Sequence, residues 1–276
     1  MRLSDLRSQA RQLFERFPTV ARSYRSLRET WTLALRNPVK TPLGFTLVGR
    51  PDMVSGEFEQ DETALLSELL KTAEVFVDVG ANIGLYACLA ATRGVRTVAI
   101  EPLPENLAYL TTNLALNGVA DVELFPLGVA DKPGVLRLYG GDTGASLVPG
   151  WAGVSAAFHT TIAISTLDIL LGARFAGKRV VVKIDVEGAE ADALTGAAGL
   201  LAQSPAPAWL VEICMTEHHP SGRNPRFAET FERFWSLGYL AQVADGSRRP
   251  VERADVERWE RAGAQDFGTH NFLFTK

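Results

Sequence analysis

The stretch Val75-Phe76-Val77-Asp78-Val79-Gly80-Ala81-Asn82-Ile83-Gly84 decides the fold of this chain. Its first five residues are apolar except for Asp78, a pattern typical of a strand buried on both faces of a parallel sheet. Gly80 and Gly84 then permit a tight turn into an apolar helical run. The stretch predicts a strand, a glycine loop and a helix, whose loop N–H groups and positive helix end face the polar groups of a nucleotide-like ligand.

The spacing of this loop separates it from the usual dinucleotide fingerprint. That fingerprint is G-x-G-x-x-G, whereas here Asn82 stands at the second glycine position and Asp78 precedes Gly80 by two residues. A second predicted strand, residues 97–101, ends in Glu101. Because an acid at that position accepts hydrogen bonds from both ribose hydroxyls of an adenosine ligand, the pattern predicts an adenosine-containing cofactor.

Strands and helices alternate from Val75 onward, which predicts an α/β fold with a Rossmann-like, doubly wound sheet of seven strands. The strands are expected at residues 75–79, 97–101, 122–127, 180–185, 209–213, 239–243 and 271–274. The last two suit an antiparallel edge pair, which gives the order 3-2-1-4-5-7-6. An insertion from Gly134 to Thr160 follows the third strand and contains a Gly-rich segment.

A basic arm precedes this body. Residues 1–40 carry nine Lys/Arg and three Asp/Glu, a net charge of +6, so the remaining residues account for the difference between −4 and +6, which is −10. Apolar residues recur in the arm at helical spacing. We therefore predict a helical extension (1–40) and a separate catalytic domain (41–276). The extension fits packing on the body or on a second subunit in a homodimer, and also peripheral contact with a membrane surface.

Composition restricts the class of protein further. The 276 residues are ordinary for a globular domain, and no apolar run approaches the roughly 20 residues that span a bilayer. Cys88 and Cys214 have neither metal-ligand nor disulfide spacing and are expected to be buried thiols in a reducing cytoplasm. The net negative charge of the body disfavours nucleic acid as a partner, because nucleic acid is also negatively charged.

Taken together, these segments resemble the FkbM family of class I methyltransferases that depend on S-adenosylmethionine (SAM). The resemblance covers about residues 55–276 and leaves the basic arm outside. The matching elements are residues 77–84, Ile100-Glu101-Pro102 with Asn106 and Asn113, Thr166-Leu167-Asp168, Lys183-Ile184-Asp185-Val186-Glu187-Gly188-Ala189-Glu190 and Asn271-Phe272-Leu273-Phe274. The resemblance implies O-methylation of a hydroxyl on a sugar, glycan or natural product, with S-adenosylhomocysteine (SAH) as product, and does not identify the acceptor.

Residues of the loop and its surroundings are the expected contacts of the cofactor. Asp78 would order the loop and approach the methionine amino group, and Glu101 would hold the ribose. Asp131, after the third strand, is expected at the adenine amino group, and Glu59 over the methionine. The residues expected along the methionine portion are Gly80, Asn82 and Gly84.

Catalytic candidates lie at the carboxyl ends of the strands, where ligands of open parallel sheets bind. A sugar hydroxyl needs a base as its oxygen forms the new bond, and Asp185, Glu212 and His218 are the candidates. Lys183 precedes Asp185 by two residues and so shares its face of the strand. Ser146, in the Gly-rich segment, is a candidate acceptor contact on a mobile lid.

Three alternatives remain open from the sequence. Oxygen ligands from Asp168, Asp185, Glu187 and Glu212 would allow a divalent cation to assist the same transfer. A SAM-binding scaffold would use the basic arm to dock a biosynthetic partner and methylate nothing. A nicotinamide oxidoreductase is disfavoured by Asn82 in place of glycine.

Overall fold

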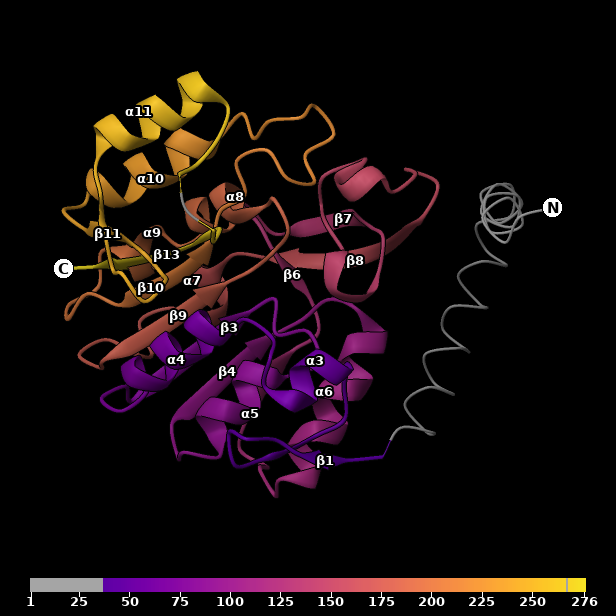
Figure 1. The fold of residues 1–276 in the computed structure, drawn as a ribbon. Coiled ribbons are helices and arrows are strands. Elements are labelled where there is room, and N and C mark those ends of the chain that lie inside the picture. Colours follow the sequence, from indigo (N-terminus) through magenta and orange to yellow (C-terminus); the bar gives the residue numbers. More distant parts are fainter. Residues whose placement is uncertain (1–36, 267) are drawn as a thin grey trace.

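The computed structural model describes residues 37–266 and 268–276. Its central feature is a mostly parallel sheet of eight strands in the order β12-β11-β13-β10-β9-β3-β4-β5 (Figure 1). The parallel strands are β5 (Glu123–Phe125), β4 (Arg96–Ile100), β3 (Val75–Val79), β9 (Val180–Ile184) and β10 (Ala208–Glu212). Strand β13 (Asn271–Thr275) lies antiparallel between β10 and β11 (Leu240–Val243).

The prediction of seven strands is wrong by one edge strand. The additional strand is β12 (Pro250–Val251), which pairs antiparallel with β11 at the sheet's edge. It is too short for an alternating pattern to reveal it. Pro250 has no N–H to donate to a ladder, so it fits only a strand with one neighbour.

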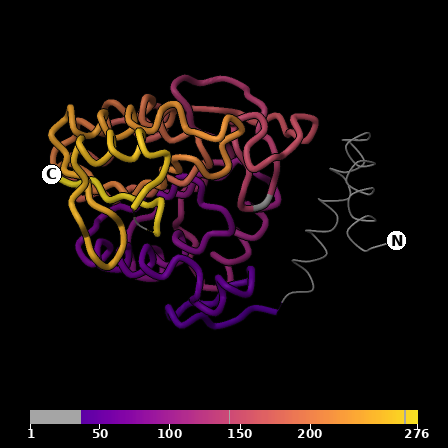
Figure 2. Tube along the Cα trace, turned by 45° about the horizontal axis from the view of Figure 1, so that its top comes forward, coloured from indigo at the N-terminus to yellow at the C-terminus, as the bar shows by residue number. Residues whose placement is uncertain are grey.

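Helices cover both faces of the sheet, which confirms the doubly wound α/β architecture (Figures 1 and 2). On β3, Val75, Val77 and Val79 pack in one core, and Phe76 packs in the other. The helices on the Phe76 side are α4 (Gln60–Leu69), α5 (Leu85–Ala91) and α6 (Pro104–Leu116). Those on the opposite side are α7 (Leu167–Leu171), α8 (Glu190–Thr195), α9 (Ala198–Leu201), α10 (Phe227–Trp235) and α11 (Arg253–Ala262).

The expected insertion forms a small sheet of its own. Its strands are β6 (Gly128–Val129), β8 (His159–Ser165) and β7 (Gly134–Tyr139), in that order, with two 3-10 turns, Asp142–Gly144 and Trp151–Gly153, between β7 and β8. A separate small core that includes Leu103, Leu138 and Ile162 attaches this sheet to the body. Figure 1 shows the small sheet beside the main sheet.

The first described residues form two short paired strands, β1 (Val39–Lys40) and β2 (Thr46–Leu47), followed by α3 (Pro51–Ser55). The side-chain amides of Asn113 in α6 and of Asn117, which follows α6 as its C-cap, pair with the backbone of this segment. Asn117 exchanges hydrogen bonds with both backbone groups of Thr46, each 2.7 Å long, and Asn113 does so with Val48 at 2.7 and 3.0 Å. Asn113 also donates to the carbonyl of Ile83 at 2.8 Å, so α6 ties this segment to the glycine loop.

Part of the predicted helical extension, residues 1–36, lies outside the described residues, and the last two residues of that extension form β1 rather than a helix. Cys88 and Cys214 are free and buried, as expected. Within the described ranges, no helix combines the length and apolar character that crossing a membrane requires.

Candidate active site

The glycine loop adopts left-handed backbone conformations at three positions, with φ of +84° at Gly80, +50° at Asn82 and +87° at Gly84. A Cβ on Gly80 would overlap the backbone carbonyl oxygen of Asp185, so only glycine lets β3 and β9 approach here. A Cβ on Gly84 would overlap the side chain of Leu110 in α6. Gly84 lines neither cavity described below, so it serves the packing of α5 on α6 rather than the predicted contact with a ligand.

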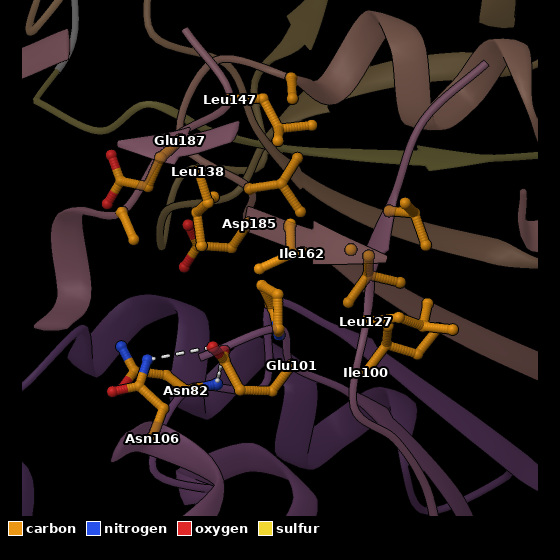
Figure 3. Close-up of a pocket in the computed structure, with 18 of the residues that line it drawn as sticks. Asn82, Ile100, Glu101, Asn106, Leu127, Leu138, Leu147, Ile162, Asp185 and Glu187 are labelled. Carbon is orange, nitrogen blue, oxygen red and sulfur yellow. Dashed lines mark hydrogen bonds between the residues drawn. The ribbon is translucent and has the colours of Figure 1, made fainter. Parts of the chain in front are cut away.

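Glu101 occupies the predicted position at the end of β4 and is buried. Its carboxylate accepts hydrogen bonds from the N–H of Asn82 at 2.9 Å, from the N–H of Leu103 at 2.9 Å and from the side-chain amide of Asn106 at 3.2 Å. Burial raises the pKa of Glu101 to about 7, and these hydrogen bonds oppose the rise. The carboxylate is therefore fixed against the glycine loop, as Figure 3 shows.

A cavity of about 600 Å³, the cradle cavity, opens above this carboxylate (Figure 3). Glu101, Asn82 and Asn106 form one polar end, and Thr143, Asp185 and Glu187 add polar groups elsewhere in the lining. The apolar lining includes Ile100, Leu127, Leu138, Leu147 and Ile162. An apolar lining with a few fixed polar groups is the usual form of a small-molecule site.

A second cavity of about 650 Å³, the acid cavity, shares Gly80, Asn82, Thr143, Asp185 and Glu187 with the first. Its remaining lining residues are Arg50, Met53, Phe58, Glu59, Ala81, Ile83, Leu85, Tyr86, Lys183 and Glu212. The two cavities therefore meet where β3 and β9 end.

Three carboxylates converge in the acid cavity. Oxygens of Glu59, Asp185 and Glu212 all lie within 4.8 Å of one another. The sequence predicts a different set of oxygen ligands for a cation, and of that set only Asp185 and Glu212 belong to this cluster. Glu59 joins the cluster from the segment before α4. The sequence predicts Glu59 over the methionine, and in the structure its carboxylate lies beside the catalytic candidates Asp185 and Glu212.

Lys183 supplies a positive charge inside this cluster. Its ammonium lies 2.8 Å from Asp185 Oδ2 and is 2% exposed, which confirms that the two residues share a face. The ammonium also stands 4.9 Å from the centre of the Tyr86 ring, and the hydroxyl of Tyr86 donates to Glu59 at 2.6 Å. Because a buried charge needs a partner, this network fixes four side chains together.

Asp185 and Glu212 carry different protonation states. Burial raises the pKa of Asp185, but Lys183 and a hydrogen bond from Glu212 outweigh burial and leave it below its usual value. Burial and the neighbouring charge of Asp185 raise the pKa of Glu212 well above its usual value. Of the two carboxyl groups, Glu212 is therefore the one that holds a proton more readily, and Asp185 the one that ionises more readily.

Glu187 links the insertion to the point where the cavities meet. Its carboxylate accepts a hydrogen bond from Nε1 of Trp151 at 2.8 Å, and its backbone carbonyl accepts one from the hydroxyl of Ser146. The Trp151 ring covers Gly188 so closely that a Cβ there would overlap it. Burial raises the pKa of Glu187 to about 8. Ser146 is fully buried, so the prediction that it contacts an acceptor from a mobile lid is wrong: it anchors the insertion.

Three predicted residues lie away from both cavities. His218 is exposed, and its ring lies against that of Trp151, 5.8 Å between ring centres. Asp131 has a side chain that is 43% exposed and lies 4.0 Å from the ammonium of Lys132. Asp168 accepts from two backbone N–H groups at the start of α9. The base, adenine and cation roles predicted for these three residues are not supported by their positions.

Asp78 lies beneath the glycine loop rather than in a cavity. It is 1% exposed, and its Oδ2 has no hydrogen-bond partner among the described residues. Burial raises its pKa to about 7, with Lys183 opposing. Its position supports a role in ordering the loop, and not the predicted contact with an amino group.

Sequence reasoning missed the lining residues Arg50, Tyr86 and Thr143, and also Trp151, which lines neither cavity but donates to Glu187. Tyr86 lies in the first turn of the helix after the glycine loop, a place the motif itself indicates. The other three come from the segment before α4 and from the insertion, and no spacing in the sequence links them to the loop.

The family described as Methyltransferase FkbM domain matches residues 78–241. Hexuronic acid methyltransferase AglP of Haloferax volcanii is 34% identical over 140 residues, which are 50% of this chain and 56% of that protein. The chain thus aligns with little more than half the length of this curated relative.

Two solved structures are among those that the chain matches. Precorrin-6y C5,15-methyltransferase from Geobacter metallireducens has a TM-score of 0.43 and 12% identity, with 83% of this chain and 90% of that chain covered. The O-methyltransferase from Bacillus cereus in complex with SAH has a TM-score of 0.41 and 12% identity, with 78% and 80% covered.

Proposed function

The chain belongs to the FkbM methyltransferase family, and from this premise we propose that it is a SAM-dependent O-methyltransferase that acts on a hydroxyl of a sugar, glycan or glycosylated natural product. The observation that carries the proposal is the junction of two cavities at Gly80 and Asp185, one built around Glu101 and the other around a carboxylate cluster. The name of the curated relative supports a sugar as acceptor.

The cradle cavity fits the adenosine and methionine parts of SAM. The left-handed Gly80 keeps the floor free of side-chain atoms, and Asn82 Oδ1 is buried without a partner among the described residues. Glu101 uses part of its acceptor capacity on the loop, and its carboxylate keeps further lone pairs for ribose hydroxyls. Glu101 would hold the ribose, the apolar lining the adenine, and Gly80 and Asn82 the methionine portion.

When bound, SAM supplies a methyl group on a positively charged sulfur, and SAH leaves with the electron pair of the broken carbon–sulfur bond. The acceptor oxygen provides the electron pair of the new carbon–oxygen bond. Its proton must then go to the protein, and Asp185 is the anionic group at the cavity junction. The oxygen becomes acidic as the new bond forms, so a carboxylate of low pKa suffices as the base.

Lys183 and Glu212 prepare Asp185 for this role. Lys183 keeps the carboxylate ionised, and Glu212, which holds the proton of the pair, fixes its orientation with a hydrogen bond. Tyr86 and Glu59 close the same network on the other side of the lysine. We assign the proton transfer to Asp185 and positioning roles to Lys183 and Glu212.

One alternative keeps the reaction and adds a divalent cation at Glu59, Asp185 and Glu212, whose oxygens cluster within 4.8 Å. Lys183 stands 2.8 Å from Asp185 and already provides the compensating charge, so a cation there would meet electrostatic repulsion. Activity that is unchanged after exhaustive chelation excludes the cation, and activity restored only by added magnesium or manganese establishes it.

The test is a transfer assay with labelled SAM and a panel of free hexoses, uronic acids and glycosylated macrolides, followed by mass spectrometry for the gain of one methylene. We expect a product that keeps its methyl group in mild alkali, as a methyl ether does. A methyl group lost in mild alkali would be an ester on a carboxyl group and would contradict a hydroxyl acceptor. Tight SAM binding without any methyl transfer across the panel would support the scaffold instead.

A further inference from the structure

Arg50 lies in the wall of the acid cavity, at the residue that precedes α3. Of the residues that line this cavity, two are basic, Arg50 and Lys183. Lys183 is buried and bound to Asp185. Arg50 has a side chain that is 43% exposed, so it is the basic lining residue that a ligand in the cavity can reach.

The guanidinium of Arg50 is held on one edge and available on another. Its Nε and Nη2 donate to the two oxygens of Asp52 at 3.1 and 2.6 Å, and its Nη1 donates to Thr143 at 3.4 Å, a long contact. A guanidinium has further N–H groups on the edge between Nη1 and Nη2, and no described residue accepts from that edge. That edge has the planar fork geometry that binds a carboxylate with two parallel hydrogen bonds.

The surroundings keep this fork in one orientation. The hydrogen bonds from Arg50 lower the pKa of Asp52, so Asp52 stays ionised and continues to hold the guanidinium. The guanidinium carbon lies 5.8 Å from the centre of the Phe58 ring. Thr143 lines both cavities, so its contact brings Arg50 to the wall that they share.

The rest of the lining explains what an arginine here would select. Asp185 is the ionised acid of the acid cavity, whereas burial raises the pKa of Glu59, Glu187 and Glu212. Arg50 is the lining group within reach of a ligand that attracts an anion. A neutral sugar has no need of a guanidinium fork. An acidic sugar would be oriented by it, with its carboxylate at Arg50 and a hydroxyl turned toward Asp185.

We propose that Arg50 binds a carboxylate of the acceptor, so that the preferred acceptors are acidic sugars of the uronic acid class. This inference rests on the proposed methyl transfer and adds the substrate class and the residue that sets it. Asp52 is the positioning residue for Arg50, and Thr143 contributes a hydroxyl beside the carboxylate.

The test compares two acceptors, glucuronic acid and glucose, which differ at one carbon. The Arg50→Gln variant should lower kcat/KM for glucuronic acid by about 10- to 100-fold, the effect expected for one charge-assisted fork. Its kcat/KM for glucose should stay within about twofold, because neither the base nor the cofactor contacts change. The Arg50→Lys variant should recover only part of the loss, since an ammonium lacks the fork.

The matched control is Arg174→Gln. Arg174 is also paired with a carboxylate, its Nη1 donating to both oxygens of Glu123 at 2.7 and 3.0 Å, but it lines neither cavity. We expect it to leave both acceptors unaffected. Equal losses for both acceptors in Arg50→Gln, or no loss for either, would overturn the inference.

A measurement on the unaltered protein keeps the inference testable if the Arg50 variants fold poorly. Glucuronamide replaces the carboxylate with a neutral amide of the same shape. We expect its KM to exceed that of glucuronic acid by about tenfold or more. An equal KM would refute the role of Arg50, whereas methyl transfer to no acceptor at all would refute the proposed function on which it rests.

Discussion

Glu101 offers the sharpest test of the cofactor site, through the single-atom change Glu101→Gln. The two carboxylate oxygens are used differently: Oε1 accepts from Leu103 and Asn106, and Oε2 accepts from the N–H of Asn82. A glutamine can keep the first two contacts with its carbonyl oxygen. Its NH₂ group then faces the N–H of Asn82, donor against donor, and the anionic acceptor for the ribose is gone.

The size of the effect follows from these contacts. Losing one charge-assisted hydrogen bond to the ribose should raise the Kd for SAM by roughly 10- to 150-fold, which corresponds to about 1.5 to 3 kcal/mol. The Asn82 N–H left without an acceptor should lower the free energy of unfolding by about 1 to 3 kcal/mol. Both effects come from the same atom, so they should appear together.

Protonation gives the same test a second readout. Because burial raises the pKa of Glu101 to about 7, the carboxylate is only partly ionised at neutral pH. The ionised form accepts from the ribose hydroxyls, so SAM affinity should rise with pH up to about 7 and level off above it. Glu101→Gln should remove this component of the pH dependence.

Isothermal titration calorimetry with SAM and with SAH measures the affinity and its pH dependence for the unaltered protein and for Glu101→Gln. Urea unfolding of the same two proteins measures the change in the free energy of unfolding. Glu68→Gln is the control, because Glu68 is exposed and pairs only with Lys71 on the surface. An affinity of Glu101→Gln equal to that of the unaltered protein at about pH 8, where Glu101 is ionised, would refute the assignment of Glu101 to the ribose.

Three further predictions concern the same region. Asp185→Asn should lower kcat by about 100-fold or more while the Kd for SAM changes only a few-fold, as steady-state kinetics and calorimetry can establish; an unchanged kcat would rule out Asp185 as the base. Gly80→Ala should lower the free energy of unfolding by about 1 to 3 kcal/mol and abolish SAM binding, because the added methyl meets the carbonyl of Asp185 at a positive φ. Burial raises the pKa of Asp78 and of Glu101 to about 7, so the folded state holds more protons than the unfolded state between the ordinary carboxyl pKa and about 7. The stability that these protons contribute is complete below that window and is lost as pH rises through it. Urea unfolding should therefore give a lower free energy of unfolding at about pH 8, above the window, than at about pH 5, in its lower part. A higher free energy of unfolding at the alkaline pH would contradict the burial of these acids.

Local patterns in the sequence predicted the parts of this site that depend on neighbouring residues. The near-continuous apolar run of Val75 to Val79 places the strand in the core, and the i, i+2 relation puts Lys183 beside Asp185. Glu101 is predicted because an acid at the end of the strand after the glycine loop is the usual contact of an adenosine ribose. Each of these inferences needs only the period of a strand and the order of parallel strands.

The parts that were missed depend on how remote segments meet. Arg50 and Thr143 are 93 positions apart and touch across the acid cavity, and Trp151 reaches Glu187 from an insertion of irregular backbone. His218 was a reasonable candidate by residue type, but the turn after β10 decides where its ring points, and loop residues carry no periodic signal. Short-range patterns contain no information on such contacts.

The proposed cofactor site and the proposed base are coupled through one residue, Asp185. The N–H of Asp185 donates to the carbonyl of Val79 at 3.0 Å, its carbonyl lies against the α-carbon of Gly80, and its side chain enters the acid cavity beside Lys183. Backbone contacts between β3 and β9, rather than mobile side chains, therefore fix the distance between the cradle cavity and the carboxylate of Asp185. Since Asp185→Asn preserves these backbone contacts, it alters the chemistry without moving the cradle, whereas Gly80→Ala moves the cradle and leaves the carboxylate in place. The two substitutions together separate SAM binding from proton transfer at a site where the two functions meet, at the ends of β3 and β9.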